Sequence, residues 1–113
     1  MKRNRPLPPH PELIRRPPRG FGWLDARLLH EDWLGLLGSE RIAALTLLAL
    51  AADRTGSSFY RRETMALALS MQRRDLDEAL ERLLDLGLVA HRPWEKDHID
   101  GVWQILSVPV RRS

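Results

Sequence analysis

The residues best suited to chemistry lie near the C-terminus, in the polar segment "HRPWEKDHID" at residues 91–100. Its two histidines, His91 and His98, are accompanied by carboxylates, and imidazole with carboxylate is a common ligand set for divalent metals. The histidines are seven residues apart, however, and no H-E-x-x-H pattern places two of them on one helix face. We therefore expect a polar loop here and no metal site.

Other catalytic groups are not recognisable in the chain. It contains no cysteine, which excludes disulfide scaffolds, thiolate metal sites and thiol nucleophiles. It also contains no G-x-S-x-G nucleophile elbow, no phosphate-binding loop and no convincing pair of acids. We expect a protein that is not an enzyme and that needs no cofactor.

The distribution of charge is more informative than the net charge of +3. Residues 1–20 contain six bases and one acid, whereas the rest of the chain is slightly acidic. Most of the prolines also lie in this segment, and each one fixes φ and removes a backbone donor. We expect a disordered, basic, proline-rich arm over residues 1–20 that is either simply solvated or follows a phosphate backbone. Its bases are Lys2, Arg3, Arg5, Arg15, Arg16 and Arg19.

Hydrophobic spacing predicts two helices at the start of a folded unit over residues 21–113. Leucine and tryptophan recur at helical spacing over about residues 24–37, with Asp25 as the expected cap and Gly35 or Gly38 as the break. The next helix should have Ser39 as its N-cap and should end just before Gly56. Because it is apolar almost all round, we expect it to be the central helix.

The remaining segments alternate between short β-prone runs and helices. The run "SSFY" is β-prone, and "RRETMALALS" predicts a short helix. A three-residue connection at residues 70–72 then leads to a helix over about 73–86, which Gly87 ends. The runs "LVAHRP" and "GVWQILSVPV" predict an antiparallel hairpin, across which Trp94 and Trp103 could face each other.

The helix predicted over 73–86 has an unusual charge pattern. Its apolar positions form one stripe: Leu76, Ala79, Leu80, Leu83 and Leu84. If Leu76 points inward, a rotation of about 100° per residue defines the outer face of the helix. That outer face carries one base, Arg74, and three acids: Glu78, Glu81 and Asp85. Arg74 with Glu78, and Asp77 or Glu78 with Arg82, are expected to form ion pairs along the helix.

This order of elements resembles the winged helix-turn-helix superfamily over about residues 39–110. The most specific piece is "ALERLLDLGLVAHRP", which looks like the junction between the recognition helix and the wing of MarR-like regulators. A fainter likeness to small bacterial helix-turn-helix proteins of replication or mobile elements rests on "GWLDARLLHEDWL" and "AADRTGSSFY". The resemblance implies a mainly α fold with a small β-hairpin: a helix-turn-helix at about 61–86 and a wing at about 88–110, preceded by an extra helix and the arm.

The resemblance also implies a set of DNA-contacting residues. Helix-turn-helix proteins present the N-terminal end of the recognition helix to the major groove, where Arg and Gln can bind guanine and adenine through two hydrogen bonds. The corresponding end here is basic, unlike the acidic outer face behind it. The implied DNA-binding residues are Arg61, Arg62, Gln72, Arg73, Arg74, Arg92 and Lys96.

We therefore expect a small, cytoplasmic, bacterial protein that binds double-stranded DNA, either in transcription regulation or as an accessory factor of replication or mobile elements. The alternative is a protein–protein interaction module that uses the acidic helix 73–86 or the tryptophan-bearing wing. The longest apolar stretch is well below the length needed to span a bilayer, so we expect no membrane partner. A homodimer through the leading helix and a monomer both stay open.

Overall fold

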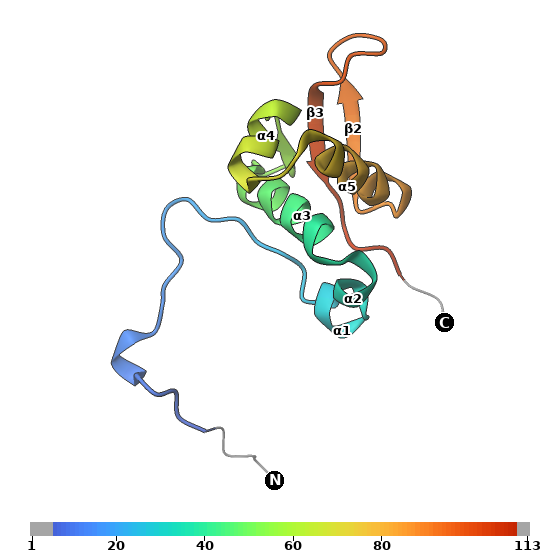
Figure 1. Ribbon diagram of the computed structural model, residues 1–113. Coiled ribbons are helices and arrows are strands. Elements are labelled where there is room, and N and C mark those ends of the chain that lie inside the picture. Colours follow the sequence, from blue (N-terminus) through green and yellow to red (C-terminus); the bar gives the residue numbers. More distant parts are fainter. Residues whose placement is uncertain (1–5, 111–113) are drawn as a thin grey trace.

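The computed structural model describes residues 6–110. Within this range the fold is mainly helical, with a small antiparallel sheet of three strands (Figure 1). The helices are α1 (Arg27–His30), α2 (Trp33–Leu37), α3 (Ser39–Ala51), α4 (Arg62–Leu69) and α5 (Arg73–Asp85). The strands are β1 (Ser57–Ser58), β2 (Val89–Pro93) and β3 (Gly101–Ile105), in the sheet order β1-β3-β2.

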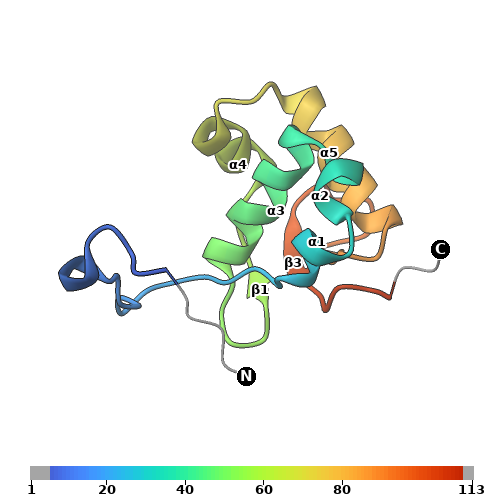
Figure 2. The same ribbon diagram turned by 90° about the horizontal axis from the view of Figure 1, so that it is seen from below.

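The segment before the folded part runs away from it. Residues 6–20 are all exposed, and they contain one short 3₁₀ turn at Pro11–Leu13. Figures 1 and 2 show this segment leading outward from the helices in both views. Arg15, Arg16 and Arg19 of the predicted basic arm therefore face solvent. The other three bases of the arm, Lys2, Arg3 and Arg5, lie outside the described residues.

The core forms between α3, α5 and the sheet. The predicted central helix α3 buries Ala44, Leu45, Leu48 and Ala49, and Trp103 of β3 is completely buried against the same cluster. The predicted stripe of α5 is confirmed, since Leu76, Ala79, Leu80 and Leu83 are all inaccessible to solvent and Leu84 is partly buried against the same core. No helix within residues 6–110 combines the length and the hydropathy that crossing a membrane requires.

The expected single helix over 24–37 is wrong, because the structure has two short helices there. Asp32 adopts the left-handed conformation, with φ of 62°, and this separates α1 from α2. Aspartate tolerates that conformation better than most residues because its short side chain can bond locally. The N-cap residue of α1 is Ala26 and not the expected Asp25, although the Asp25 carboxylate Oδ1 does accept a hydrogen bond of 2.9 Å from the Arg27 N–H. Gly38, with φ of 83°, ends α2 as predicted, whereas Gly35 lies within it.

Both predicted ends of the central helix need correction. Gly38, not Ser39, is the N-cap of α3, and no side chain caps that end. At the other end α3 stops at Ala51, five residues before Gly56. The reason is Asp53, whose Oδ1 accepts hydrogen bonds from the N–H groups of Thr55 and Ser57 at 2.8 and 3.0 Å. This side-chain turn competes with the helix for the backbone and reverses the chain into β1.

The predicted hairpin is confirmed as antiparallel, but its details differ. Its second strand ends at Ile105, and residues 106–110 continue without a strand. The "SSFY" run supplies β1, which pairs with β3 on the side opposite β2. Trp94 and Trp103 do not face each other. Trp103 lies opposite His91 in the register, while Trp94 follows the end of β2 and stacks on Phe59.

Candidate nucleic-acid interface

Arg62, at the start of α4, is the residue that holds the predicted DNA-facing elements together. Its side chain is only 16% exposed, and its Nη1 donates to Asp77 of α5 at 2.8 Å. Its Nε donates to the Ile99 carbonyl in the β2–β3 loop at 3.0 Å. Its guanidinium also lies 5.3 Å from the centre of the Trp103 ring, within the range of a cation–π contact. Arg62 therefore joins α4, α5 and the hairpin, and its Nε and Nη1 both donate within the protein.

The first turn of α4 is capped from the hairpin loop. The backbone N–H of Arg62 donates to the Asp100 carboxylate at 2.9 Å, while Arg61, the N-cap residue, makes no side-chain cap. The free N–H groups at a helix start favour a carboxylate partner. Asp100 thus fixes the distance between the loop and α4. Together with Arg62, it sets where the hairpin stands relative to the α4–α5 pair.

Asp77 on α5 binds two arginines at once. It accepts from Arg62 and also from Arg73 Nε at 3.1 Å, one turn earlier on the same helix. Burial raises the pKa of Asp77, but the hydrogen bonds from Arg62 and Arg73 outweigh it and leave the pKa below its ordinary value. Arg73 is thus tied to a carboxylate, with a half-exposed side chain.

Replacing Asp77 by asparagine should lower the free energy of unfolding by about 1–2 kcal/mol at pH 7. Because the folded pKa lies below the unfolded value of about 3.9, the stabilisation is complete above that value. It is lost as the pH falls through the folded pKa, so the difference in stability between the two proteins should be smaller at pH 3 than at pH 7. Urea unfolding at both pH values measures this. Glu81→Gln, which neutralises an exposed acid of α5, should show no such difference, and equal effects in both variants would contradict the role of Asp77.

Gln72 and Arg74 lie at the exposed tip of α5. Gln72 is the N-cap residue, Arg74 follows in the first turn, and both are exposed. Arg74 makes no ion pair with any residue that the structure describes. Its expected partner Glu78 instead bonds Arg41 of α3, and Asp77 bonds Arg62 and Arg73 in place of Arg82. The predicted outer face is confirmed as exposed along its length, at Arg74, Glu78, Glu81 and Asp85.

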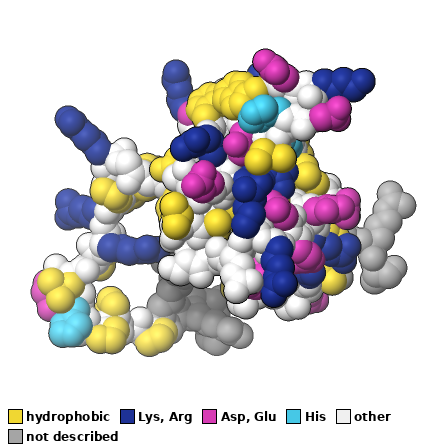
Figure 3. Space-filling view, turned by 45° about the horizontal axis from the view of Figure 1, so that its top comes forward, with side chains coloured by type: hydrophobic (Ala, Val, Ile, Leu, Met, Phe, Trp, Pro, Cys, Tyr) yellow, Lys and Arg dark blue, Asp and Glu magenta, His cyan; other side chains and the backbone are white. Residues whose placement is uncertain are grey.

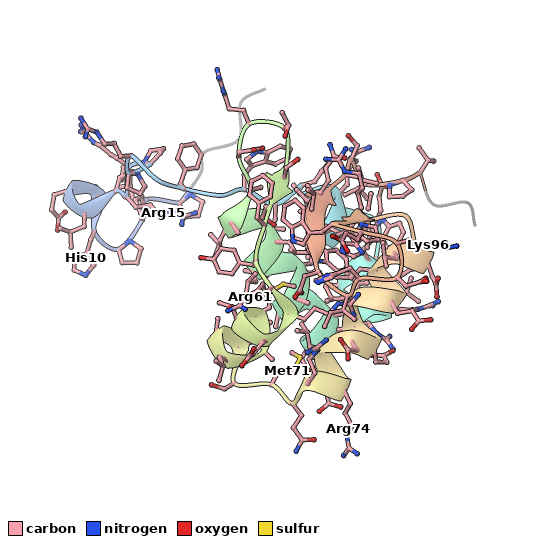
Figure 4. All side chains as sticks on the ribbon, turned by 90° about the horizontal axis from the view of Figure 1, so that it is seen from above. His10, Arg15, Arg61, Met71, Arg74 and Lys96 are labelled. Atoms are coloured by element: carbon pink, nitrogen blue, oxygen red, sulfur yellow. The ribbon has the colours of Figure 1, made fainter. Side chains whose placement is uncertain are left out.

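The other predicted cations are exposed but spread apart. Arg61, Arg92 and Lys96 all face solvent. Figure 4 shows Arg74 pointing outward from the tip of α5, Arg61 beside α4, and Lys96 on the other side of the view. Figure 3 shows Lys and Arg side chains mixed with Asp and Glu over the face it presents. On the face shown in Figure 3, the cations of the described residues are therefore interspersed with acids and do not form one continuous basic patch.

The histidines of "HRPWEKDHID" have local partners. The His91 ring stacks on Trp103, with 4.1 Å between the centres, and burial followed by the nearby Arg62 charge lowers the pKa of His91. His98 bonds within its loop, where its Nδ1 accepts from the Asp100 N–H at 3.0 Å. Among residues 6–110, no three His, Asp or Glu side chains are grouped so that they could hold a metal ion.

Several of these features were not foreseen from the sequence. The Arg73–Asp77 pair has the i, i+4 spacing that would have revealed it. No such signal exists for the contacts of Arg62, whose partners are 15 to 38 residues away. The stacked pair of Phe59 and Trp94 also joins distant segments, with 6.1 Å between the ring centres.

Comparisons of the chain with protein-family models, with curated proteins and with solved structures found no match. Its own geometry is accordingly the basis for the assignment of function.

Proposed function

We propose that this protein is a winged helix-turn-helix protein that binds double-stranded DNA. The observation that carries the proposal is the exposed first turn of α5, where the N-cap residue Gln72 and Arg74 face solvent directly after the short connection from α4. Three residues connect α4 to α5, and Ser70 takes up the turn with φ of 51°. A helix held in this way can place its N-terminal end in a major groove.

The residues of the proposed site fall into two classes, those that are available to contact DNA and those that position other residues. Arg74 and Gln72 bond no side chain among residues 6–110, so their donors can serve base edges, while Arg61, Arg92 and Lys96 are exposed and suited to phosphate. Arg62 and Arg73 act as positioning residues, because their side chains bond Asp77. The acids Glu81 and Asp85 lie farther along α5 and would repel phosphate there, which restricts DNA contact to the tip of the helix. Binding of DNA through the tip of α5 would suit a transcriptional regulator and an accessory factor of replication or mobile elements equally well.

A salt titration tests the proposal directly. Binding to a random 20-bp duplex would be measured from 50 to 200 mM salt, for the full chain and for a chain without residues 1–20. Each lost phosphate contact lowers the slope of log affinity against log salt by about 0.9. We expect the shortened chain to bind with a smaller but definite slope. A shortened chain that stays folded and shows no salt-sensitive binding would refute the proposal.

The exposed aromatic pair favours a second candidate function, which is docking to another protein. Phe59 and Trp94 are 59% and 54% exposed although they stack on each other, and exposed tryptophan is typical of binding hot spots. Trp94→Ala separates the two functions, because it removes half of the stacked pair and leaves the tip of α5 unchanged. The change should abolish binding of a protein partner that docks on Phe59 and Trp94, whereas it should leave duplex binding unchanged if the tip of α5 contacts DNA.

A further inference from the structure

A cavity of about 500 Å³ lies on a different part of the molecule from the proposed DNA-binding tip. It opens between the segment that leads into α1, the end of α3, the turn before β1 and the chain after β3. Its volume falls in the range of roughly 300–1,000 Å³ that is usual for small-molecule sites. Its base is apolar and buried, formed by Leu28, Leu45, Ala49, Leu88 and Val108.

Hydrogen bonds and close backbone contacts hold each wall of the cavity in place. Gly22 packs so tightly against α3 that a Cβ atom there would lie 2.4 Å from the carbonyl oxygen of Ala49. The turn before β1 is fixed by the carboxylate of Asp53 and by the Ile105 N–H, which donates to the Gly56 carbonyl at 2.9 Å. The Leu106 N–H donates to the Leu88 carbonyl at 3.0 Å. The cavity is therefore formed before any ligand binds, which reduces the entropy that binding costs.

The rim of the cavity carries aromatic side chains and one available cation. Phe21 and Trp23 border the opening and are 62% and 73% exposed, an arrangement that leaves apolar surface ready to cover a ligand. Of the charged side chains in the lining, Asp25 is paired with Arg27, and Asp53 Oδ1 already accepts three hydrogen bonds within its own turn. Arg54 is exposed and makes no ion pair or side-chain hydrogen bond with the described residues, so its guanidinium donors can serve a ligand.

We propose that this cavity binds an apolar anion, a small molecule with a hydrocarbon or aromatic body and one acidic group. The body lies on Leu45, Ala49 and Leu88, under Phe21 and Trp23, while the acidic group bonds Arg54 at the rim. The hydrocarbon or aromatic body of the ligand should carry no second charge, because a charge at the buried, apolar base of the cavity would lose its hydration without gaining a partner. The inference is independent of the DNA-binding proposal, because the two sites have no residue in common.

Two fluorescent probes of the same ring system test the site in the full chain. 1-Anilinonaphthalene-8-sulfonate carries one anionic group, and N-phenyl-1-naphthylamine is its neutral counterpart. We expect both probes to bind at one site per chain, the anion with a dissociation constant on the order of 10 µM and about tenfold more tightly than the neutral probe. In Arg54→Ala the anion should lose that tenfold advantage, while the neutral probe binds as before. Arg74→Ala removes an arginine from the other site and should change neither affinity.

A second variant tests whether the probes occupy the cavity itself. Ala52 lines the cavity, so Ala52→Trp should fill it and abolish binding of both probes. Ala68→Trp adds the same side chain on α4, outside this cavity, and should leave both probes bound. Equal binding of both probes in all variants would overturn the proposal. Loss of both probes in Ala52→Trp without any effect of Arg54→Ala would overturn the assignment of the ligand as an anion. If Ala52→Trp fails to fold, the comparison of the two probes in Arg54→Ala still decides.

Discussion

Replacing Trp103 by alanine should reduce the free energy of unfolding by about 3–5 kcal/mol, the usual cost of removing a buried aromatic side chain. Trp103 is inaccessible to solvent, its ring lies against His91, and Arg62 sits over it. Its removal therefore leaves a cavity in the core and also takes away the surface on which Arg62 is held. Chemical unfolding in urea, followed by circular dichroism, measures the change.

The matched control for this variant is on the same hairpin. Trp94→Ala removes the same side chain from a position that is 54% exposed, where the stacking on Phe59 is worth about 1 kcal/mol. We expect the Trp94 variant to stay within about 1 kcal/mol of the original protein. Comparable losses in the two variants would contradict the assignment of Trp103 to the core.

Replacing Arg74 by glutamate should weaken binding to duplex DNA by about 10–100-fold. The change removes the donors at the tip of α5 and puts a negative charge where phosphate or a base edge would lie, and a single arginine contact is worth about 1–3 kcal/mol. Stability should hardly change, because Arg74 is exposed and makes no ion pair with the described residues. Titration of a labelled duplex by fluorescence anisotropy at a fixed salt concentration measures the loss.

Arg54→Glu is the control for charge alone. It makes the same change in net charge at an exposed arginine, but in the turn before β1. We expect it to weaken duplex binding by about twofold at most, through the long-range field of the protein. If both reversals reduced the affinity equally, net charge would explain the binding and the tip of α5 would lose its special role.

Much of the fold followed from local rules in the sequence. The stripe that contains Leu76 and Leu83 fixed the inward face of α5, and the structure buries both. Gly38 and Gly87 marked helix ends because both adopt positive φ, which other residues accept poorly. Local rules failed where side chains compete with the helix for the backbone, as Asp53 does beyond α3.

The sequence alone determined which residues could be cations at the surface of such a fold, because composition and helical spacing are local properties. Only the tertiary structure decided which of those cations are free. Arg62 meets Asp77, Ile99 and Asp100 through contacts that span 15 to 38 residues, and Glu78 meets Arg41 across 37. The cavity beside Arg54 likewise exists only because four separate segments of the chain meet there. Spacing along a helix predicts neighbours within one element, whereas the partner of a charge on another element depends on how the elements pack.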